Sequence, residues 1–340
     1  MQGRDKKSGN NFALDLGNTN TLISNQDHIL IDQPSFIAFN ENKKIQAVGD
    51  GAFRMVGKTH NGLKTIKPLK DGVIADYNSA SQLVRELVRK AYMNKWPLFG
   101  FNYIVSGIPH ATTEVEKRAL RDAMAQFRVD KPYLVYEPVA AAIGNGLNIT
   151  EPDGKLIVDI GGGITEMVVI SLSGIVTSKS VKVAGDTFDE DIQEHFRKNY
   201  NIGICLNTAE MIKIHVGSAL NYLKHPPVPY DVVGKDLITG IPRKVTIGYA
   251  EVADILEKSV SQIEQTLFNV LEECPPEVSG DICENGVVLT GGGSLLRGLK
   301  ERLESRIKLP IYQDDNALHA VSKGLSMILQ QPEKYKGVLL

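Results

Sequence analysis

The chain has 340 residues, a length typical of two or three domains. Its residues are 42% hydrophobic and 23% charged, as in a globular protein with a sizeable core. The net charge of −2 excludes a general attraction to nucleic acid, so no nucleic-acid partner is expected. Three cysteines without a CxxC pair favour a reducing compartment over a metal site or a disulfide framework.

The first residues, MQGRDKKSGNN, are polar and lead directly into a predicted strand, so no signal peptide is expected. No apolar run approaches the roughly 20 residues that a membrane-spanning helix needs. Any contact with a membrane is therefore expected to be peripheral.

Predicted strands and helices alternate along the chain. Near the start, NFALDLGNTNTLISN predicts two strands joined by a tight turn at Gly17. The stretch TEVEKRALRDAMAQF predicts a helix that begins with a capping box of Thr113 and Glu116. We expect the buried stripe of this helix to contain Val115, Ala119, Ala123 and Phe127.

A long helix is predicted over residues 252–274. Its buried stripe is expected to contain Val252, Ile255, Leu256, Val260, Ile263, Leu267, Val270 and Leu271. The short apolar runs YLVYEP, KLIVDI and NGVVLT predict interior strands. Strands that alternate with helices predict the α/β class, with both sheet faces covered.

Two segments share one plan, which is an apolar strand, an aspartate, a glycine turn with threonine, and a second apolar strand. They are Phe12–Ile23, with Asp15 before its turn, and Leu156–Ile170, with Asp159. This similarity predicts a duplicated unit and two related domains. The alternative is chance agreement of a short pattern, because Asp-x-Gly turns are common.

The glycines in LIVDIGGGITEMVVI indicate a phosphate-binding hairpin. A P-loop motif is absent, and a Rossmann turn would open into a helix, whereas TEMVVISL is β-branched and predicts a strand. The backbone N–H groups of such a turn can hold phosphate oxygens. An aspartate beside phosphate requires a cation between them, most naturally Mg²⁺ through its water shell.

A third glycine cluster lies in VVLTGGGSLLRGLKERL. The predicted strand ends at Thr290, Gly291 to Gly293 form a turn, and Ser294 is expected to cap the following helix. The flat glycine surface suits an adenine or a ribose. The alternative is a tight strand-to-helix connection without a ligand.

These three elements together resemble the superfamily of actin, heat-shock chaperones and sugar kinases. More narrowly, the chain resembles the MreB family of bacterial actin homologues from about residue 12 to 330. The stretches that carry the resemblance include LDLGNTNTLI, IKPLKDGVIADY, TEVEKRALRDA, YEPVAAAIGNGL, VDIGGGITEMVVISLSGIV, GDTFDEDI, TAEMIKIHVGSA, DLITGIPRKVTI and GVVLTGGGSLLRGL. The resemblance implies an actin-like fold, with two duplicated α/β domains flanking a nucleotide cleft.

The resemblance also implies a site for ATP or ADP with Mg²⁺. It assigns the phosphates to Gly17, Asn18, Thr19 and Asn20 and to Gly161, Gly162 and Gly163. It assigns the Mg²⁺ water shell to Asp15 and Asp159. It assigns adenosine to Glu210, Met211, Ile212 and Lys213 and to Gly291, Gly292, Gly293 and Ser294. Without the resemblance, Glu210 and Lys213 would be interpreted as a solvated surface salt bridge.

Catalysis is implied for Glu137, which would orient the attacking water, and for Thr165. The alternative for Glu137 is a structural carboxylate that caps the next helix. The family usually has threonine where this chain has Ile164, which cannot donate or accept a hydrogen bond. We therefore expect slow hydrolysis. Further departures from the family pattern are Asn18, Thr19, Tyr136 and Ala184.

A loop of apolar side chains is the candidate membrane contact. It contains Trp96, Leu98, Phe99 and Phe101, with cationic Arg89, Lys90 and Lys95 nearby. The resemblance implies a membrane-inserting loop here, and many copies in a filament would add avidity. The alternative is a loop folded over the core.

The resulting hypothesis is an ATP-binding cytoskeletal protein that forms membrane-associated filaments and governs cell shape, with slow hydrolysis. Its expected partners are further copies of itself, the inner membrane surface and other cell-shape proteins. Domain I is expected over 1–149 plus 316–340, and domain II over 150–315. Small subdomains are expected near 33–74 and 183–246. The alternatives are a small-molecule kinase, a chaperone-type ATPase, and a filament that binds ATP but barely hydrolyses it.

Overall fold

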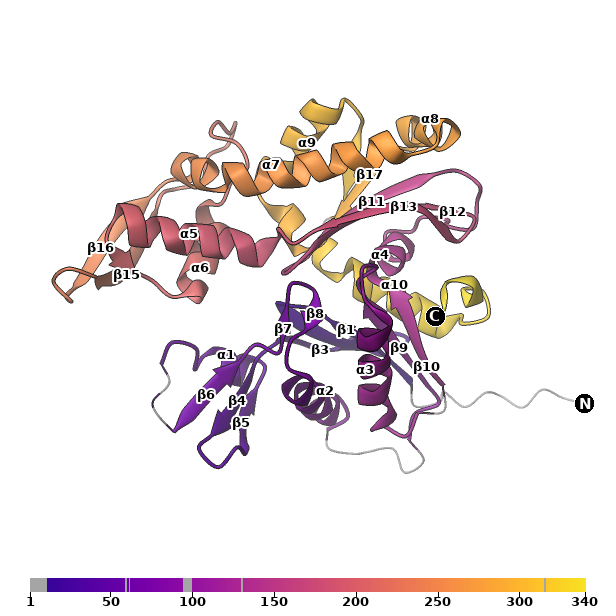
Figure 1. The fold of residues 1–340 in the computed structure, drawn as a ribbon, viewed down its shortest axis with the longest axis horizontal. Coiled ribbons are helices and arrows are strands. Elements are labelled where there is room, and N and C mark those ends of the chain that lie inside the picture. Colours follow the sequence, from indigo (N-terminus) through magenta and orange to yellow (C-terminus); the bar gives the residue numbers. More distant parts are fainter. Residues whose placement is uncertain (1–10, 59, 61, 94–99, 130, 315) are drawn as a thin grey trace, which may run out of the picture. The chain divides into compact units, whose positions relative to one another are not determined.

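The computed structural model describes all residues except 1–10, 59, 61, 94–99, 130 and 315. The chain divides into two compact units (Figure 1). Unit 1 comprises Met1–Pro152, Ile170–Gly174 and Leu318–Leu340. Unit 2 comprises Asp153–Val169 and Ile175–Ala317. Within the described ranges, no helix is both long enough and apolar enough to cross a bilayer.

The centre of unit 1 is a five-stranded sheet in the order β10-β9-β1-β2-β3. Its strands are β1 (Asn11–Leu16), β2 (Asn20–Ser24), β3 (Ile29–Pro34), β9 (Tyr103–Ile108) and β10 (Lys131–Tyr136). Strand β1 runs antiparallel to β2 and parallel to β9, which in turn is parallel to β10. The predicted tight turn at Gly17 therefore joins two neighbouring antiparallel strands, as expected.

The longer helices of unit 1 are α2 (Tyr77–Ala91), α3 (Glu114–Ala125), α4 (Glu137–Gly144) and α10 (Ala320–Gln330). The smaller elements are β4 (Ile37–Asn40), β5 (Ile45–Val48), β6 (Leu63–Ile66), α1 (Asp50–Phe53), β7 (Leu69–Lys70), β8 (Val73–Ile74) and the 3-10 turn η3 (Lys336–Val338). Strands β5, β4 and β6 form a small sheet of their own.

Helix α3 confirms one prediction and corrects another. The capping box of Thr113 and Glu116 is present. The expected stripe is confirmed at Ala123 and Phe127, which are buried, but Val115 is 79% exposed, and Leu120 and Met124 belong to the buried face as well. Leucine and methionine one turn apart bury more apolar surface than valine and alanine, and they set the face that packs on the core.

Unit 2 repeats the same sheet topology. Its five-stranded sheet has the order β13-β12-β11-β17-β18, which matches β3-β2-β1-β9-β10 strand for strand. The strands are β11 (Lys155–Ile160), β12 (Thr165–Ser171), β13 (Gly174–Val181), β17 (Val287–Thr290) and β18 (Ile311–Gln313). Strand β11 is parallel to β17, as β1 is to β9. The duplication predicted from two short segments thus extends over both sheets.

The helices of unit 2 are α5 (Gly185–Asn199), α6 (Leu206–Val216), α7 (Tyr249–Glu273), α8 (Pro276–Asn285) and α9 (Leu299–Ile307), with 3-10 turns η1 (Gly292–Leu295) and η2 (Ala317–His319). The stripe predicted for α7 is largely confirmed: six of its eight members are fully buried, and Ile255 and Leu271 pack partly buried against the same core.

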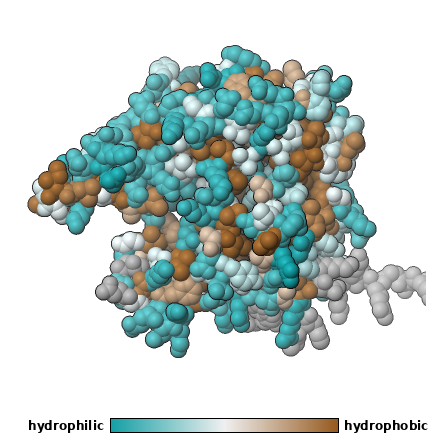
Figure 2. Space-filling model, in the orientation of Figure 1, coloured by the Kyte–Doolittle hydropathy of each residue, from teal (hydrophilic) through white to brown (hydrophobic). Residues whose placement is uncertain are grey.

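A smaller sheet of unit 2 contains β14 (Ile202–Gly203), β15 (Tyr230–Asp236) and β16 (Pro242–Ile247). The turn between β15 and β16 exposes three large apolar side chains, Leu237, Ile238 and Ile241. Figure 2 shows hydrophobic surface at this end of the small sheet. An exposed apolar cluster of this kind is a candidate protein contact.

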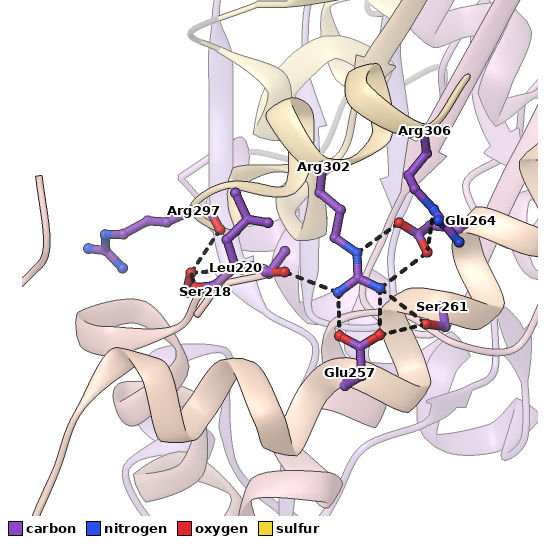
Figure 3. Close-up of polar contacts among 9 residues, drawn as sticks. Ser218, Leu220, Glu257, Ser261, Glu264, Arg297, Arg302 and Arg306 are labelled. Carbon is purple, nitrogen blue, oxygen red and sulfur yellow. Dashed lines mark hydrogen bonds and ion pairs between the residues drawn. The ribbon is translucent and has the colours of Figure 1, made fainter. Parts of the chain in front are cut away.

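Helices α7 and α9 are joined by a half-buried ionic network (Figure 3). The Arg302 guanidinium binds Glu264 at 2.7 Å and Glu257 at 2.6 Å, and it also donates to the carbonyl of Ala219. The hydrogen bond to Glu264 is the main cause of the raised pKa of Arg302. One guanidinium therefore fixes α9 against two positions of α7 that lie about two turns apart.

Candidate functional site

The second glycine turn runs from Gly161 to Ile164 and joins β11 to β12. The amide of Gly161 donates to the carbonyl of Ile164 at 3.1 Å, which closes the turn. From the start of α5, the amide of Gly185 donates to the carbonyl of Gly161 at 3.1 Å, and that of Asp186 donates to Gly162 at 2.7 Å. The carbonyls of the turn are thus held from one side.

The remaining amides of this turn are available to a ligand. Among the described residues, the N–H groups of Gly162 and Gly163 donate to no partner. Consecutive backbone N–H groups in a glycine turn form a concavity that binds anions such as phosphate oxygens. The hairpin predicted from the sequence is therefore present, with two N–H donors that suit an anion.

The first glycine turn has the same closing hydrogen bond. The amide of Gly17 donates to the carbonyl of Asn20 at 3.1 Å. Ser35 holds this turn, because its hydroxyl donates to Gly17 O at 2.6 Å and its amide donates to Thr19 O at 2.8 Å. The side chain of Asn18 accepts from the amide of Gly72 at 3.1 Å. The two turns are therefore alike in geometry as well as in sequence.

Asp15 and Asp159 occupy equivalent positions, each two residues before the glycine that opens its turn. Both are buried, with 9% and 8% of their surface exposed. Burial raises the pKa of Asp159 to about 6. A buried carboxylate beside an anion-binding turn fits a hydrated divalent cation, which would supply the missing positive charge.

The third glycine turn packs against Asp159. A Cβ atom on Gly291 would lie 2.3 Å from Asp159 Oδ1, and the glycine has a φ of +82°. The prediction that Ser294 caps the next helix is wrong. Ser294 lies inside η1, where its hydroxyl donates to the carbonyl of Gly291 at 2.7 Å, and α9 begins only at Leu299. A short 3-10 turn, which the sequence pattern did not separate from the helix, accounts for the difference.

One of the two segments expected at adenosine, residues 210–213, lies within α6. Ile212 is fully buried in the core of unit 2, whereas Met211 is 43% exposed. Lys213 is held by unit 2 itself, since its ammonium donates to Gly185 O and to Asp189 Oδ2, both at 2.9 Å. Lys213 therefore forms its salt bridge with Asp189, so the alternative interpretation of Glu210 and Lys213 as a salt bridge on the surface is wrong.

Glu137 is the first residue of α4 and directly follows β10. It lines a cavity of about 30 Å³ together with Leu16 and Gly107, which places it beside the first glycine turn. A Cβ atom on Gly107 would lie 3.0 Å from Glu137 Cγ. The cavity is large enough for an ordered water molecule, which needs about 10–15 Å³. A carboxylate in this position can hold water in unit 1.

Thr165 and Ile164 differ in their surroundings. Thr165 is completely buried, and its hydroxyl donates to the carbonyl of Val183 at 2.7 Å. A catalytic role for this hydroxyl would require that hydrogen bond to be exchanged. Ile164 is only partly buried, at the end of the turn. The residue at the turn itself therefore contributes no hydrogen-bonding side chain.

One part of the predicted membrane loop belongs to the core instead. Phe101 is 1% exposed, and its ring packs edge-to-face on Phe12 at 4.9 Å and on Tyr92 at 5.2 Å. An aromatic cluster at the base of the sheet therefore takes this side chain, and its assignment to the exposed tip is wrong. Trp96, Leu98 and Phe99 lie outside the described residues.

Sequence reasoning missed the residues that hold the two turns. Ser35 is completely buried behind the first turn, and the amides of Gly185 and Asp186 support the second. A serine after a proline carries no motif that would indicate this role. Gly185 and Asp186 act through their backbone, which a sequence pattern does not display.

The fold is actin-like: a structure of MreB5 of Spiroplasma citri bound to AMPPNP matches with a TM-score of 0.90 at 33% identity, covering 96% of this chain and 98% of that one. The MamK double helical filament matches in fold alone, with a TM-score of 0.76 at 20% identity over 95% of this chain and 99% of that one.

The sequence identifies the family to which the chain belongs. The model of the MreB/Mbl protein family matches residues 9–337. The cell shape-determining protein Mbl of Bacillus subtilis is 38% identical over 95% of this chain and 96% of its own length. The cell shape-determining protein MreB of Escherichia coli K12 is 37% identical over 97% and 96%. The chain belongs to the MreB/Mbl family of cell shape-determining proteins.

Proposed function

We propose that this chain binds ATP or ADP with Mg²⁺ and assembles into filaments that govern cell shape. The observation that carries the proposal is the pair of equivalent glycine turns, each preceded by a buried aspartate and each closed by the same hydrogen bond. The relatives support it, since MreB5 of Spiroplasma citri has been solved with AMPPNP and with ADP. MamK, which has the same fold, forms a double helical filament.

The proposed nucleotide contacts follow the turns. The phosphates would be bound by amides of residues 17–20 and 161–163, and the Mg²⁺ water shell by Asp15 and Asp159. Adenosine would lie near residues 210–213 and 291–294. The domain limits of 1–149 plus 316–340 and of 150–315, with their small subdomains near 33–74 and 183–246, are part of the same proposal.

We propose slow hydrolysis. Glu137 would orient the attacking water, supported by its place at the start of α4 beside a water-sized cavity. Ile164 removes one hydrogen-bonding side chain from the turn. Thr165 is retained as a candidate on the condition that it gives up its bond to Val183.

We propose peripheral attachment to the inner face of the cell membrane through Trp96, Leu98 and Phe99, and contact with other cell-shape proteins. The cationic side chains of Arg89 and Lys90 lie in the last turn of α2 before this segment. Arg89 pairs with Glu86 and Lys90 donates to the carbonyl of Val48, and both would have to exchange these partners for anionic headgroups. A single loop of this size binds weakly, so attachment would depend on many copies in one filament.

The test is pelleting of the purified chain with ATP, ADP or AMPPNP, with and without anionic liposomes, while phosphate release is recorded. We expect nucleotide-dependent pellets and slow release. The variant Asp159→Ala should lose the nucleotide response, whereas Asp153→Ala, which removes an exposed carboxylate on the same segment, should retain it. A chain that pellets in no nucleotide and binds no liposomes would refute the proposal. Unchanged liposome binding in Trp96→Ser would reject the membrane segment alone.

A further inference from the structure

A buried ion pair joins α5 to α6 directly behind the second glycine turn. Lys213 Nζ lies 2.9 Å from Asp189 Oδ2, and Asp189 is only 7% exposed. The other oxygen, Oδ1, is buried and has no hydrogen-bond partner in the part of the chain that the structure describes. An unsatisfied buried carboxylate oxygen is costly, so a purely structural pair would be expected to satisfy both oxygens.

The same ammonium is linked to the second glycine turn by hydrogen bonds through the backbone of Gly185. Lys213 Nζ donates to the carbonyl of Gly185 at 2.9 Å, and the amide of Gly185 donates to the carbonyl of Gly161. An ammonium group has three N–H donors, and the described residues take two of them. The third donor is thus held at a defined position relative to the turn, on the helix where adenosine is proposed to bind.

The surroundings of Asp189 act on its pKa in opposite directions. Burial is the largest effect and raises the pKa of Asp189 to about 7, Lys213 opposes it, and Glu210 on α6 and Asp186 on α5 raise the pKa further.

The other elements that pack on α5 add little charge. On α7, Glu251 binds His195 at 2.9 Å, and Lys258 acts on Asp191. Strand β14 (Ile202–Gly203) carries no titratable side chain. Asp189 therefore has Lys213 as its principal partner.

We propose that Asp189 is a positioning residue of the nucleotide site, which holds the Lys213 ammonium so that its remaining N–H donates to a ribose hydroxyl of the bound nucleotide. The inference rests on the proposed nucleotide binding. It adds Asp189 to the site and predicts that nucleotide affinity depends on pH. Ionised Asp189 holds the ammonium through a charge-assisted hydrogen bond, and protonated Asp189 does not. Because the ionised form is lost as pH falls through about 7, nucleotide affinity should fall in the same window.

The experiment measures the dissociation constants of ATP and 2′-deoxy-ATP by calorimetry, with Mg²⁺, on the full chain at about pH 6 and about pH 8 on either side of the expected titration. The wild type should bind ATP about two- to tenfold more weakly at the lower pH, the effect of about one hydrogen bond. Asp189→Asn should bind weakly at both pH values and should discriminate less between the two nucleotides.

The control is Asp191→Asn on the same helix, whose carboxylate accepts from Ser259 on α7. It should keep the wild-type pH profile and nucleotide preference. Lys213→Met should also abolish the pH dependence, which keeps the inference testable should Asp189→Asn fail to fold. Wild-type affinity and pH profile in either Asp189→Asn or Lys213→Met would overturn the inference and leave nucleotide binding standing. Absence of ATP binding by the wild type would instead overturn the proposed function.

Discussion

Ile164 is the residue at which this chain departs most clearly from the chemistry expected of its turn. Its backbone carbonyl closes the hairpin, but its side chain can neither donate nor accept. We expect Ile164→Thr to raise the rate of phosphate release by about tenfold or more, since it adds a donor to a water-positioning network.

The matched control for this change is Ile164→Val, which resembles threonine in shape and lacks the hydroxyl. It should leave phosphate release near the wild-type rate. Both variants are measured at saturating ATP, with affinity determined separately. Equal rates in the Thr and Val variants would show that the hydroxyl is not what the turn lacks.

Gly291 is constrained by its backbone and by Asp159 at once. A Cβ atom would lie 2.3 Å from Asp159 Oδ1 and 2.4 Å from Ile160 O, at a φ of +82°. Gly291→Ala should therefore lower the free energy of unfolding by about 2 kcal/mol or more, above the roughly 1 kcal/mol of left-handed strain. Gly146→Ala, at φ +80° with nothing within 4 Å, isolates the strain. Urea denaturation measures the free energy of unfolding of both variants. Equal losses of stability in the two would contradict the predicted clash at Gly291.

Residues in repeated motifs were predictable, and residues that depend on tertiary packing were not. The glycine turns follow from short patterns because the backbone conformation is local. Phe101 was misplaced because its burial depends on Phe12, which is distant in sequence. The Lys213–Asp189 pair joins two helices at a distance of 24 residues, and no spacing rule indicates it.

At the level of elements, the helices and strands follow from periodicity, and their duplication follows from two short segments. The stripe of α7 was predictable because it spans seven turns, over which the period averages out local exceptions. The stripe of α3 was predicted only in part, because a helix of 12 residues offers few apolar positions: Ala123 is buried as expected, but Leu120 is buried and Val115 is not.

The contact between α9 and α7 depends on one buried arginine. The side chains of Arg302 and Glu264 are 11% and 5% exposed. We expect Arg302→Ala to reduce the free energy of unfolding by about 3 kcal/mol or more, because it leaves the Glu264 carboxylate buried and unpaired. The double variant Arg302→Met with Glu264→Met should recover most of this loss, since two apolar side chains replace the pair.

Thermal and urea denaturation measure the free energy of unfolding of the single and the double variant. Arg306→Ala serves as the control, because Arg306 lies 3.8 Å from the same carboxylate but is 63% exposed, so its loss should cost about 1 kcal/mol or less. A double variant no more stable than Arg302→Ala would show that the pair itself, and not the unpaired charge, carries the stability.

At the level of the whole molecule, assembly requires an exposed surface that a second copy can bind. The turn between β15 and β16 exposes Leu237, Ile238 and Ile241. This turn is ordered, because Asp236 Oδ1 accepts from the amides of Ile238 at 3.0 Å and Thr239 at 2.9 Å. Both hydrogen bonds lower the pKa of Asp236, and the bond from the Thr239 amide has the larger effect. A rigid apolar turn loses little conformational entropy on binding, which favours association.

We therefore expect this turn to contact a second copy of the chain in the proposed filament. Ile238→Lys should raise the critical concentration for pelleting by about tenfold, because burial of an isoleucine is worth about 1.5–3 kcal/mol. The matched control is Val115→Lys, which charges an equally exposed side chain, 79% in both cases, on α3. Nucleotide affinity should be unchanged in both variants, since both side chains are exposed to solvent and neither belongs to a glycine turn. If Ile238→Lys pellets like the wild type while Val115→Lys does not, the contact belongs to α3 and not to this turn.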